Sequence, residues 1–524
     1  MDNPAKKALL VSTILAAAAS PALAEIVTLK TTDGSVSVSG DLLSFDNDFY
    51  VLQTAVGQMA IAASNVSCEG AACPELKPTH SEFTIAGSKS LGDKLIPALA
   101  IAYGSEIGGT SEMTEAENAK VVNIAANEQG TAAIEIKATD TRQGFNALLA
   151  GEADFALASR PIRNREIRAL EEAGKANPRA AGREHIVALD GLLLVTHPEN
   201  PVRAISEVNA ALAFAGRIGS WVELGGRNAP INLYVRENDS GSREVFDTLL
   251  MRPNGLSIGG NVQVMESDAA IAEAVRNDPN GLGFTSFANA SNAAALDIEG
   301  VCGLRTPATA FTIKTEEYPL TRLLYMYEGD NGLQRHARDF LSFVNSEEGQ
   351  EQVARAGFID QSISSETINS QGIRVASAVV NNTEFNDFLQ MQDMFGLLLA
   401  SDRLSTTYRF ETGSARLDAR GQADIDRLSE ILSDDRFANK EVLFVGFTDS
   451  VGREDLNQVL SQQRAEQVRR TILDANPALA SRIRTRSVGF GEVSPLGCNE
   501  TDQGRRINRR VEVWVKDIAA ADQN

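Results

Sequence analysis

The pair of side chains that most clearly suggests a ligand-binding site, by type and by spacing, is Asp449 and Arg464. The acid follows an apolar stretch, residues 442–447, that is typical of a buried strand, and the base lies on the helix expected after it. A carboxylate can hold an ammonium group, and a planar guanidinium can hold a carboxylate through two hydrogen bonds. Because Arg464 lies beside the apolar positions of that helix, its charge must be paired by the protein or by a ligand.

The residues around this pair follow a motif with fixed spacing. Its positions are Thr448-Asp449, Gly452, Asn457, Leu460-Ser461, Arg464-Ala465 and Asn508-Arg509-Arg510-Val511-Glu512. With them, roughly residues 407–516 resemble an OmpA-like peptidoglycan-binding domain, although Phe447 stands where many members carry His. The resemblance implies that four residues bind the diaminopimelate end of the peptidoglycan stem: Thr448, Asp449, Asn457 and Arg464. The alternative is an internal Asp–Arg pair that fixes the loop on the helix.

The net charge of the chain limits its partners. The 524 residues carry a formal charge of −21, and 43% apolar and 23% charged residues are ordinary for globular protein. A chain of this length is expected to hold about three or four domains. The acidic excess argues against nucleic acid as a partner and against charge-driven docking on an anionic membrane. A local cluster of hydrogen-bond donors can still bind an anion.

Residues 1–24 have the pattern of an export signal. Lys6 and Lys7 form the basic start, residues 8–19 the apolar stretch, and Ala22-Leu23-Ala24 the cleavage site. The apolar stretch is too short to span a membrane, and no cysteine stands directly after the cleavage site for a lipid anchor. We therefore expect no transmembrane span and a location in the periplasm of a Gram-negative bacterium.

Alternating apolar and polar residues at 25–78 predict a small β module. Cys68 and Cys73 enclose a short loop that a disulfide can close, which fits an oxidising compartment. A metal site is the weaker alternative, because no His or further Cys stands at ligand spacing. Cys302 and Cys498 lie in different predicted domains, and the sequence leaves open whether they are free or paired.

Strand and helix signals alternate from residue 79 to about 370, which predicts an α/β fold with a largely parallel sheet. Three loops rich in glycine and hydroxyl residues precede helices there: 86–92, 138–144 and 236–242. Backbone N–H groups and hydroxyls at a helix start make a site for an oxyanion, and Arg236 adds charge beside the third loop. One such loop is weak evidence, since Ser-Gly before a helix is most often a plain N-cap, but three in one region favour an anion site.

Further motifs accompany these loops. They are Arg236 with Ser240-Gly241-Ser242, Gly87-Ser88 with Ser90, residues 153–161, residues 189–195 with Asn200-Pro201-Val202, and residues 318–322. With them, roughly residues 80–370 resemble the phosphate-type periplasmic solute-binding proteins of ABC transporters, in which two lobes close on a tetrahedral oxyanion. The resemblance implies these anion-binding residues: Ser88, Ser90, Thr139, Thr141, Arg160, Arg236, Ser240, Gly241 and Ser242.

Arg160 departs from the family pattern. Phosphate binders have an Asp at this position, whose carboxylate accepts the proton of hydrogen phosphate and so rejects sulfate. An arginine only donates hydrogen bonds, so strict selectivity for phosphate does not follow from this position. Asp140 and Asp239 are the candidates for a replacement acceptor.

No catalytic constellation stands out in the sequence. The four histidines are scattered and form no metal-ligand pattern, and neither a G-x-S-x-G elbow nor a Walker loop is present. These histidines are His80, His185, His197 and His336. We therefore expect a binding protein, not an enzyme, with no metal site and no cofactor.

The sequence thus predicts a multidomain α/β protein. The expected parts are a signal peptide (1–24), a small β module (25–78), a two-lobed type II periplasmic-binding-protein fold (79–370, second lobe about 195–305), a linker with a docking helix (371–405) and an OmpA-like βαβαβ domain (406–518). The expected role is to bind phosphate or a related oxyanion for an ABC permease, on peptidoglycan and in association with the outer membrane. The alternative is an envelope-tethering protein whose middle region is an interaction module.

Overall fold

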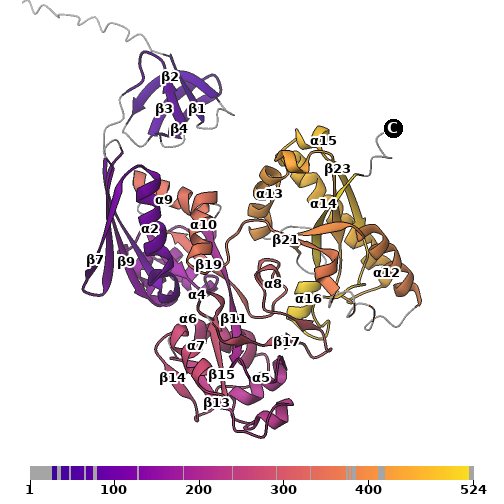
Figure 1. Cartoon of the computed structure of the whole chain (residues 1–524). Coiled ribbons are helices and arrows are strands. Elements are labelled where there is room, and N and C mark those ends of the chain that lie inside the picture. Colours follow the sequence, from indigo (N-terminus) through magenta and orange to yellow (C-terminus); the bar gives the residue numbers. More distant parts are fainter. Residues whose placement is uncertain are drawn as a thin grey trace, which may run out of the picture. The chain divides into compact units, whose positions relative to one another are not determined.

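The computed structural model describes residues 26–518 apart from 32–36, 46–48, 64–65, 75–78, 127–128, 181, 239, 291, 331, 373–375, 377–378, 380–384 and 411–418. The predicted signal peptide and Asp239 lie outside the described residues. The chain divides into a smaller unit, which consists of the residues up to Thr79 with the short segment that ends at Gly130, and a larger unit that contains most of the remaining chain (Figure 1). None of the described helices combines the length and the apolar character needed to cross a membrane.

The smaller unit contains a five-stranded antiparallel sheet in the order β4-β3-β2-β1-β5. Its strands are β1 (Ile26–Thr31), β2 (Ser37–Phe45), β3 (Phe49–Thr54), β4 (Gly57–Ala62) and β5 (Val66–Glu69). Alternate residues form its core, as the strand period of two requires: Val27, Leu29, Tyr50 and Leu52. The predicted disulfide between Cys68 and Cys73 is confirmed.

The first lobe of the larger unit is built on one end of a long mixed sheet. Its strands are β6 (Thr79–Ser88), β7 (Thr110–Ala116), β8 (Ala119–Ala126), β9 (Gly130–Thr139) and β10 (Phe155–Ala158). Its longer helices are α2 (Leu95–Glu106), α3 (Thr141–Ala150), α4 (Asn164–Glu172), α9 (Arg335–Asn345) and α10 (Glu347–Arg355). Phe155 and Leu157 of β10 join one hydrophobic cluster and Ala156 and Ala158 another, so both faces of this strand are covered.

Two long strands, β11 (Glu184–Thr196) and β19 (Thr321–Glu328), connect the lobes. β19 pairs with β10, while β11 pairs with β19 through residue 191 and with β15 (Gly281–Ser286) of the second lobe from residue 192. These three pairings are antiparallel, so the prediction of a largely parallel sheet is wrong. Parallel pairs occur inside the lobes, between β6 and β10 and between β13 (Asn232–Arg236) and β15.

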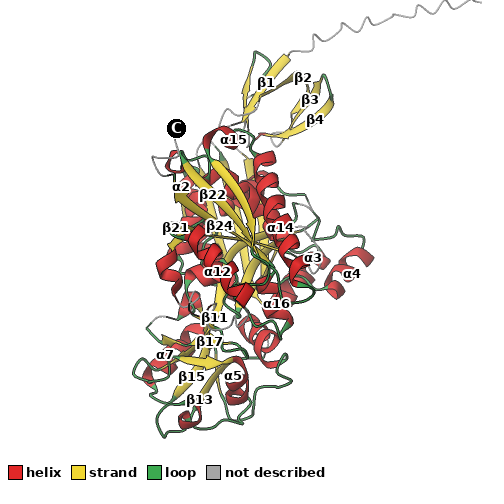
Figure 2. Cartoon of the chain, turned by 90° about the vertical axis from the view of Figure 1, so that its right-hand side faces the viewer, coloured by secondary structure: helices red, strands yellow, loops and turns green. Residues whose placement is uncertain are grey.

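The second lobe has helices on the two sides of its sheet, α5 (Glu207–Phe214) and α7 (Asp268–Asn277) (Figure 2). Strand β13 lies between β15 and β14 (Gln263–Met265), and the short helix α6 (Gly241–Phe246) follows it. A separate small sheet contains β12 (Ala204–Ser206), β17 (Asp297–Glu299) and β18 (Arg305–Thr306). The rings of Phe246 and Phe284 stack 4.0 Å apart in the core of this lobe.

The C-terminal domain is a second α/β layer structure. Its sheet has the order β20-β21-β24-β22-β23, with β20 (Ser365–Thr367), β21 (Ser401–Arg409), β22 (Lys440–Gly446), β23 (Arg484–Gly489) and β24 (Arg510–Asp517). Helices α13 (Ala419–Ile431) and α14 (Glu454–Ala475) contribute to one core, and α12 (Phe385–Leu398) contributes to another. In strand β22, Val442 and Phe444 belong to the first core and Leu443 and Val445 to the second, so helices cover both faces.

Covalent and ionic contacts join the C-terminal domain to the rest of the larger unit. Cys302, in the turn between β17 and β18, forms a disulfide with Cys498, so these two cysteines are paired. Glu316, which precedes β19, forms ion pairs with Arg420 and Arg506. Burial alone would raise the pKa of Glu316, but these arginines lower it to about 2. The carboxylate is therefore charged over the whole physiological pH range.

Candidate ligand-binding sites

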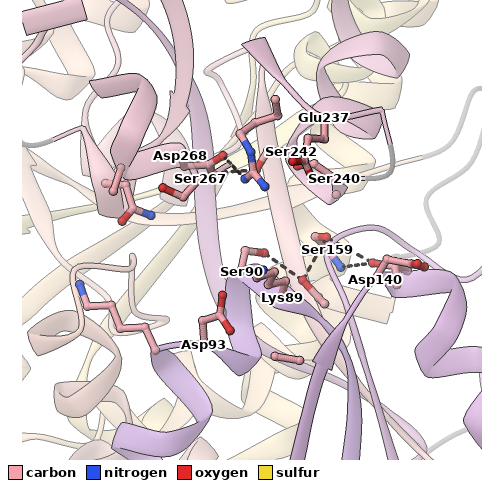
Figure 3. Close-up of a pocket in the computed structure, with 18 of the residues that line it drawn as sticks. Lys89, Ser90, Asp93, Asp140, Ser159, Glu237, Ser240, Ser242, Ser267 and Asp268 are labelled. Carbon is pink, nitrogen blue, oxygen red and sulfur yellow. Dashed lines mark hydrogen bonds and ion pairs between the residues drawn. The ribbon is translucent and has the colours of Figure 1, made fainter. Parts of the chain in front are cut away.

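A cleft of about 470 Å³ lies between the two lobes (Figure 3). Nearly all of the predicted anion-binding residues line it: Ser88, Ser90, Thr139, Thr141, Arg236, Ser240, Gly241 and Ser242. The three loops that the sequence singles out thus meet at one place, although they are far apart along the chain. Arg160 is the exception, because it is not among the residues that line this cleft.

Hydroxyl groups of the first lobe form a connected cluster in the cleft. The Ser88 Oγ atom lies 2.9 Å from Ser90 Oγ and donates to Ser159 Oγ over 3.3 Å. Thr141 Oγ1 lies 3.3 Å from Ser159 Oγ and accepts a hydrogen bond from the Ser159 backbone N–H. Ser159, which directly follows β10, was missed by the sequence argument. Its position after a short buried strand is the signal that could have identified it.

Gly87 allows the strands under this cluster to approach closely. Its backbone has a φ of +130°, and a Cβ atom there would lie 2.3 Å from the Leu157 carbonyl oxygen. A side chain at this position would push β6 away from β10 and separate Ser88 from Ser159. The glycine of the first loop is therefore required by packing as well as by backbone conformation.

The second lobe contributes a guanidinium and hydroxyls that Asp268 organises. Arg236 donates from Nη1 to Asp268 Oδ1 (2.9 Å) and from Nε to the Met265 carbonyl oxygen (3.2 Å). Ser242 donates from Oγ to Asp268 Oδ2 (2.7 Å), and Arg322 donates from Nη1 to Ser242 Oγ (3.2 Å). Sequence reasoning missed Asp268, although it follows β14 and begins α7 in the same way as the loops that were found.

Acidic and basic groups share the cleft. Lys89, Lys94 and Arg236 bring positive charge, and the acids that line it are Asp93, Asp140, Glu237, Glu266 and Asp268. Burial raises the pKa of Asp93, and the nearby Lys89, Lys120 and Arg236 oppose that shift. Asp140 is the N-cap of α3, where its Oδ1 atom accepts from the backbone N–H groups of Arg142 and Gln143. That oxygen of Asp140 is thus already committed to the helix.

Arg160 lies in a network of ion pairs beside the cleft. It donates two hydrogen bonds to Glu166, at 2.8 and 2.9 Å, and one to Glu244 Oε1 at 3.2 Å. Burial would raise the pKa of Glu166, but the hydrogen bonds from Arg160 and from the Arg163 backbone lower it. The predicted place of Arg160 among the anion ligands is therefore not what the structure shows.

The predicted peptidoglycan-binding residues gather at the end of β22 and the start of α14. All four of these residues are buried, namely Thr448, Asp449, Asn457 and Arg464. The pair Asp449 and Arg464 is therefore shielded from bulk water. Asn457 donates from Nδ2 to the carbonyl oxygens of Asp449 (3.3 Å) and Val451 (3.4 Å), and so holds the loop on the helix. The backbone N–H of Thr448 donates to the Gly491 carbonyl oxygen at 2.7 Å.

A third charged residue, Arg509, joins Asp449 and Arg464. It donates from Nη1 to Asp449 Oδ2 at 2.6 Å, so the ion pair observed for this acid is with Arg509. The guanidinium of Arg464 lies over the Phe410 ring at 5.1 Å. Burial and the charge of Arg509 lower the pKa of Arg464 to about 10, while Asp449 acts in the opposite direction. The predicted motif contained Arg509, but its role as a partner of Asp449 was missed.

Among the described residues, one group of three potential metal ligands comes together. This group is Cys302, Cys498 and Glu500, and the two sulfur atoms are bonded to each other. A disulfide has no thiolate to offer a metal. His80 contacts Thr131 and Glu82 at the surface, and the buried His336 contacts Tyr103, so these histidines lie in separate places.

Comparison with protein families finds two matches. Residues 80–348 match the model of the PBP superfamily domain, and residues 409–509 match that of the OmpA family. The phosphate-binding protein PstS of Borreliella burgdorferi is 26% identical over 228 residues, which cover 41% of this chain and 75% of that protein. The probable lipoprotein YiaD of Escherichia coli is 38% identical over 109 residues, 21% of this chain and 48% of YiaD. The chain thus spans about half the length of YiaD.

Solved structures also match parts of the chain. A putative phosphate ABC transporter substrate-binding protein from Clostridium perfringens, with bound phosphate, is 26% identical. The match has a TM-score of 0.41 and covers 53% of this chain and 99% of that one. The peptidoglycan-associated lipoprotein of Burkholderia pseudomallei is 23% identical, with a TM-score of 0.18 and coverage of 21% and 89%.

Proposed function

The chain belongs to the PBP superfamily, and from this premise we propose that its cleft binds phosphate or a related tetrahedral oxyanion. The observation that carries the proposal is the meeting of hydroxyls from both lobes with Arg236 in one cleft. Hydroxyls donate single hydrogen bonds in different directions, which suits the four oxygens of a tetrahedral anion, and the guanidinium supplies charge. The relative PstS of Borreliella burgdorferi is named a phosphate-binding protein.

Thermal melting with added anions tests the proposed ligand. The mature chain is melted with phosphate, sulfate and molybdate, and at a hundred times its dissociation constant a ligand stabilises by about 2.7 kcal/mol. We expect phosphate to raise the melting temperature, and Arg236→Gln to remove the shift. Arg276→Gln is the control, because Arg276 is exposed on α7 of the same lobe. Absence of a shift with every oxyanion in the unaltered protein would overturn the proposal.

We propose that the C-terminal domain binds the diaminopimelate end of the peptidoglycan stem peptide. Asp449 suits the ammonium group of that ligand, and Arg464 suits its carboxylate. The ion pair between Asp449 and Arg509 orients the acid before the ligand arrives. Thr448 and Asn457 hold the loop that carries the acid. The OmpA family match and the likeness to YiaD over this segment support the proposal.

Pelleting with purified sacculi tests wall binding. We expect the unaltered protein to sediment with sacculi, and Asp449→Ala or Arg464→Ala to remain in the supernatant. Arg470→Ala is the matched control, because Arg470 lies on α14 like Arg464 but is 68% exposed. If both site variants pellet like the parent, diaminopimelate binding at this site is wrong.

Together these proposals describe a periplasmic, envelope-associated binding protein. We assign the solute-binding domain to residues 79–364 and the wall-binding domain to residues 365–518, because β20, α12 and β21 all pack within the C-terminal domain and residues 371–405 are therefore not a separate linker. The β module is assigned to residues 25–78. The proposed role is to hold an oxyanion at the peptidoglycan for an ABC uptake system. Phosphate uptake by three strains tests the transport step: the parent, cells lacking the protein and cells carrying Arg236→Gln. Equal uptake in all three would contradict the proposed role.

A further inference from the structure

We propose that Glu244 of the second lobe is a positioning residue that clasps the lobes together and slows the escape of the anion. The clasp consists of Glu244 on α6 and its two partners from the first lobe, Arg160 and Arg163. None of the three lines the cleft, so the clasp acts without touching the ligand. Its effect on ligand release rests on the proposed binding function.

The clasp joins two segments, one in each lobe, that each carry a cleft hydroxyl. Arg160 directly follows Ser159 in the first lobe, and Glu244 lies shortly after Ser242 on α6 in the second. Arg160 Nε donates to Glu244 Oε1 over 3.2 Å, and Arg163 Nη2 donates to the same oxygen. The distance between the hydroxyls of Ser159 and Ser242 therefore depends on these ion pairs.

Backbone packing beside the clasp shows that the lobes are in contact there. A Cβ atom placed on Gly241 would lie 2.4 Å from Ser159 Oγ, so the absent side chain of Gly241 is what lets the lobes meet. Such contact is the feature of a closed cleft at this edge. The ion pairs hold this contact when no ligand is present, because none of their atoms comes from a ligand.

The arginine side of the clasp is held in place before the lobes meet. Arg160 forms two hydrogen bonds with Glu166 of α4 and lies over the Phe145 ring at 5.8 Å. Contacts within the first lobe thus already orient the guanidinium of Arg160. Closing the lobes therefore costs little additional side-chain entropy at this residue. The arginine at the position that the family pattern gives to an acid thus contacts both lobes.

Burial decides how strong the clasp can be. The side chains of Arg160, Arg163 and Glu244 are 11%, 33% and 26% exposed, so they are only partly screened by water. A closed state that is already populated binds ligand more tightly, because less free energy is spent on closing. We expect loss of Glu244 to raise the dissociation rate about three- to tenfold, the effect of a partly buried pair.

Stopped-flow phosphate binding to Glu244→Gln tests the effect on release. We expect faster dissociation with an association rate close to that of the parent, whereas general damage to the site would slow association as well. Asp330→Asn is the matched control, because Asp330 is 24% exposed and pairs with Arg183 within the first lobe. Arg163→Gln should add little to Glu244→Gln, since both remove the same contact. Unchanged dissociation in Glu244→Gln would overturn the inference.

A measurement without ligand separates the clasp from the proposed function. Spin labels at Glu172→Cys and Asn228→Cys, two exposed positions in the first and second lobes, report the distance between the lobes. We expect a longer and broader distance distribution in Glu244→Gln than in the parent or in Asp330→Asn. An unchanged distribution overturns the clasp, even where phosphate binds. If the parent binds no oxyanion, the proposed function fails and the distance measurement alone decides the clasp.

Discussion

At the scale of single residues, the hydrogen bonds of Ser242 within the protein determine whether its hydroxyl donates to a ligand or accepts from it. The Ser242 hydroxyl donates a hydrogen bond to Asp268 and accepts one from Arg322. Its single hydrogen therefore points to Asp268. A lone pair of Ser242 Oγ remains for the ligand, and it can accept the proton of hydrogen phosphate. Sulfate has no proton to give, so its oxygen would face that lone pair without a hydrogen bond.

Asp268→Asn should therefore weaken the preference for phosphate over sulfate. The new amide can donate to Ser242, which frees the hydroxyl hydrogen for the ligand. We expect the ratio of phosphate to sulfate affinity to fall about tenfold, the equivalent of one hydrogen bond, as measured by calorimetry. Asp278→Asn is the control, because Asp278 contacts Asn232 and Tyr234 outside the cleft. An unchanged ratio in Asp268→Asn would contradict the assignment.

At the scale of elements, strands β11 and β19 join the lobes and place a buried ion pair behind the cleft. Asp190 on β11 and Arg322 on β19 are almost fully buried and 2.6 Å apart. Burial raises the pKa of Asp190, while Arg322 acts against the shift. Asp190 also accepts from the backbone N–H groups of Gly191 and Phe287. The same arginine reaches Ser242, so the strands that connect the lobes also orient the site.

Asp190→Asn should destabilise the larger unit, because Arg322 would keep a buried charge without its partner. We expect a loss of about 3–5 kcal/mol in urea unfolding, the range found when one member of a buried pair is removed. The double variant Asp190→Asn/Arg322→Met should recover part of this loss, since it also removes the charge. Equal stability of the single and double variants would show that charge burial is not the cause.

At the scale of the whole molecule, a disulfide joins the second lobe to the C-terminal domain. Cys302 and Cys498 are separated by 196 residues, whereas Cys68 and Cys73 of the smaller unit are separated by 5. Cys498 is next to Asn499, whose side chain accepts from the Ser450 backbone N–H beside Asp449. The bond therefore links the second lobe to the loop that flanks the proposed wall site.

Removal of the long-range disulfide should lower the stability of the larger unit much more than removal of the short one. Loop-closure entropy gives about 5 kcal/mol for Cys302→Ser/Cys498→Ser and about 2 kcal/mol for the short loop. Both tryptophans, Trp221 and Trp514, lie in the larger unit, so their fluorescence follows its unfolding. We expect Cys68→Ser/Cys73→Ser to leave that transition unchanged. A transition in Cys302→Ser/Cys498→Ser that equals the parent's would contradict the prediction.

Local patterns in the sequence predicted many of the residues that line the cleft. Hydroxyl and glycine residues at loop ends identified Ser88, Thr141 and Ser242, because strand and helix periods determine where loops begin. Asp268 was missed, and so was the role of Arg509 as a partner of Asp449, since each is recognised by a partner far along the chain. Arg160 was misplaced for the same reason: its direction depends on Glu166 and Glu244, and no local pattern contains both.

The sequence by itself determined the two family resemblances, their order along the chain and the loops that line the cleft, because these follow from short-range spacing. Tertiary structure alone decided three further matters: the pairing of Cys302 with Cys498, the commitment of the Ser242 hydrogen to Asp268, and the place of Arg160 beside the cleft. Each depends on which groups come within a few ångströms after folding. Hydrogen bonds and ion pairs act only over such distances, so their partners are defined in space and not in sequence.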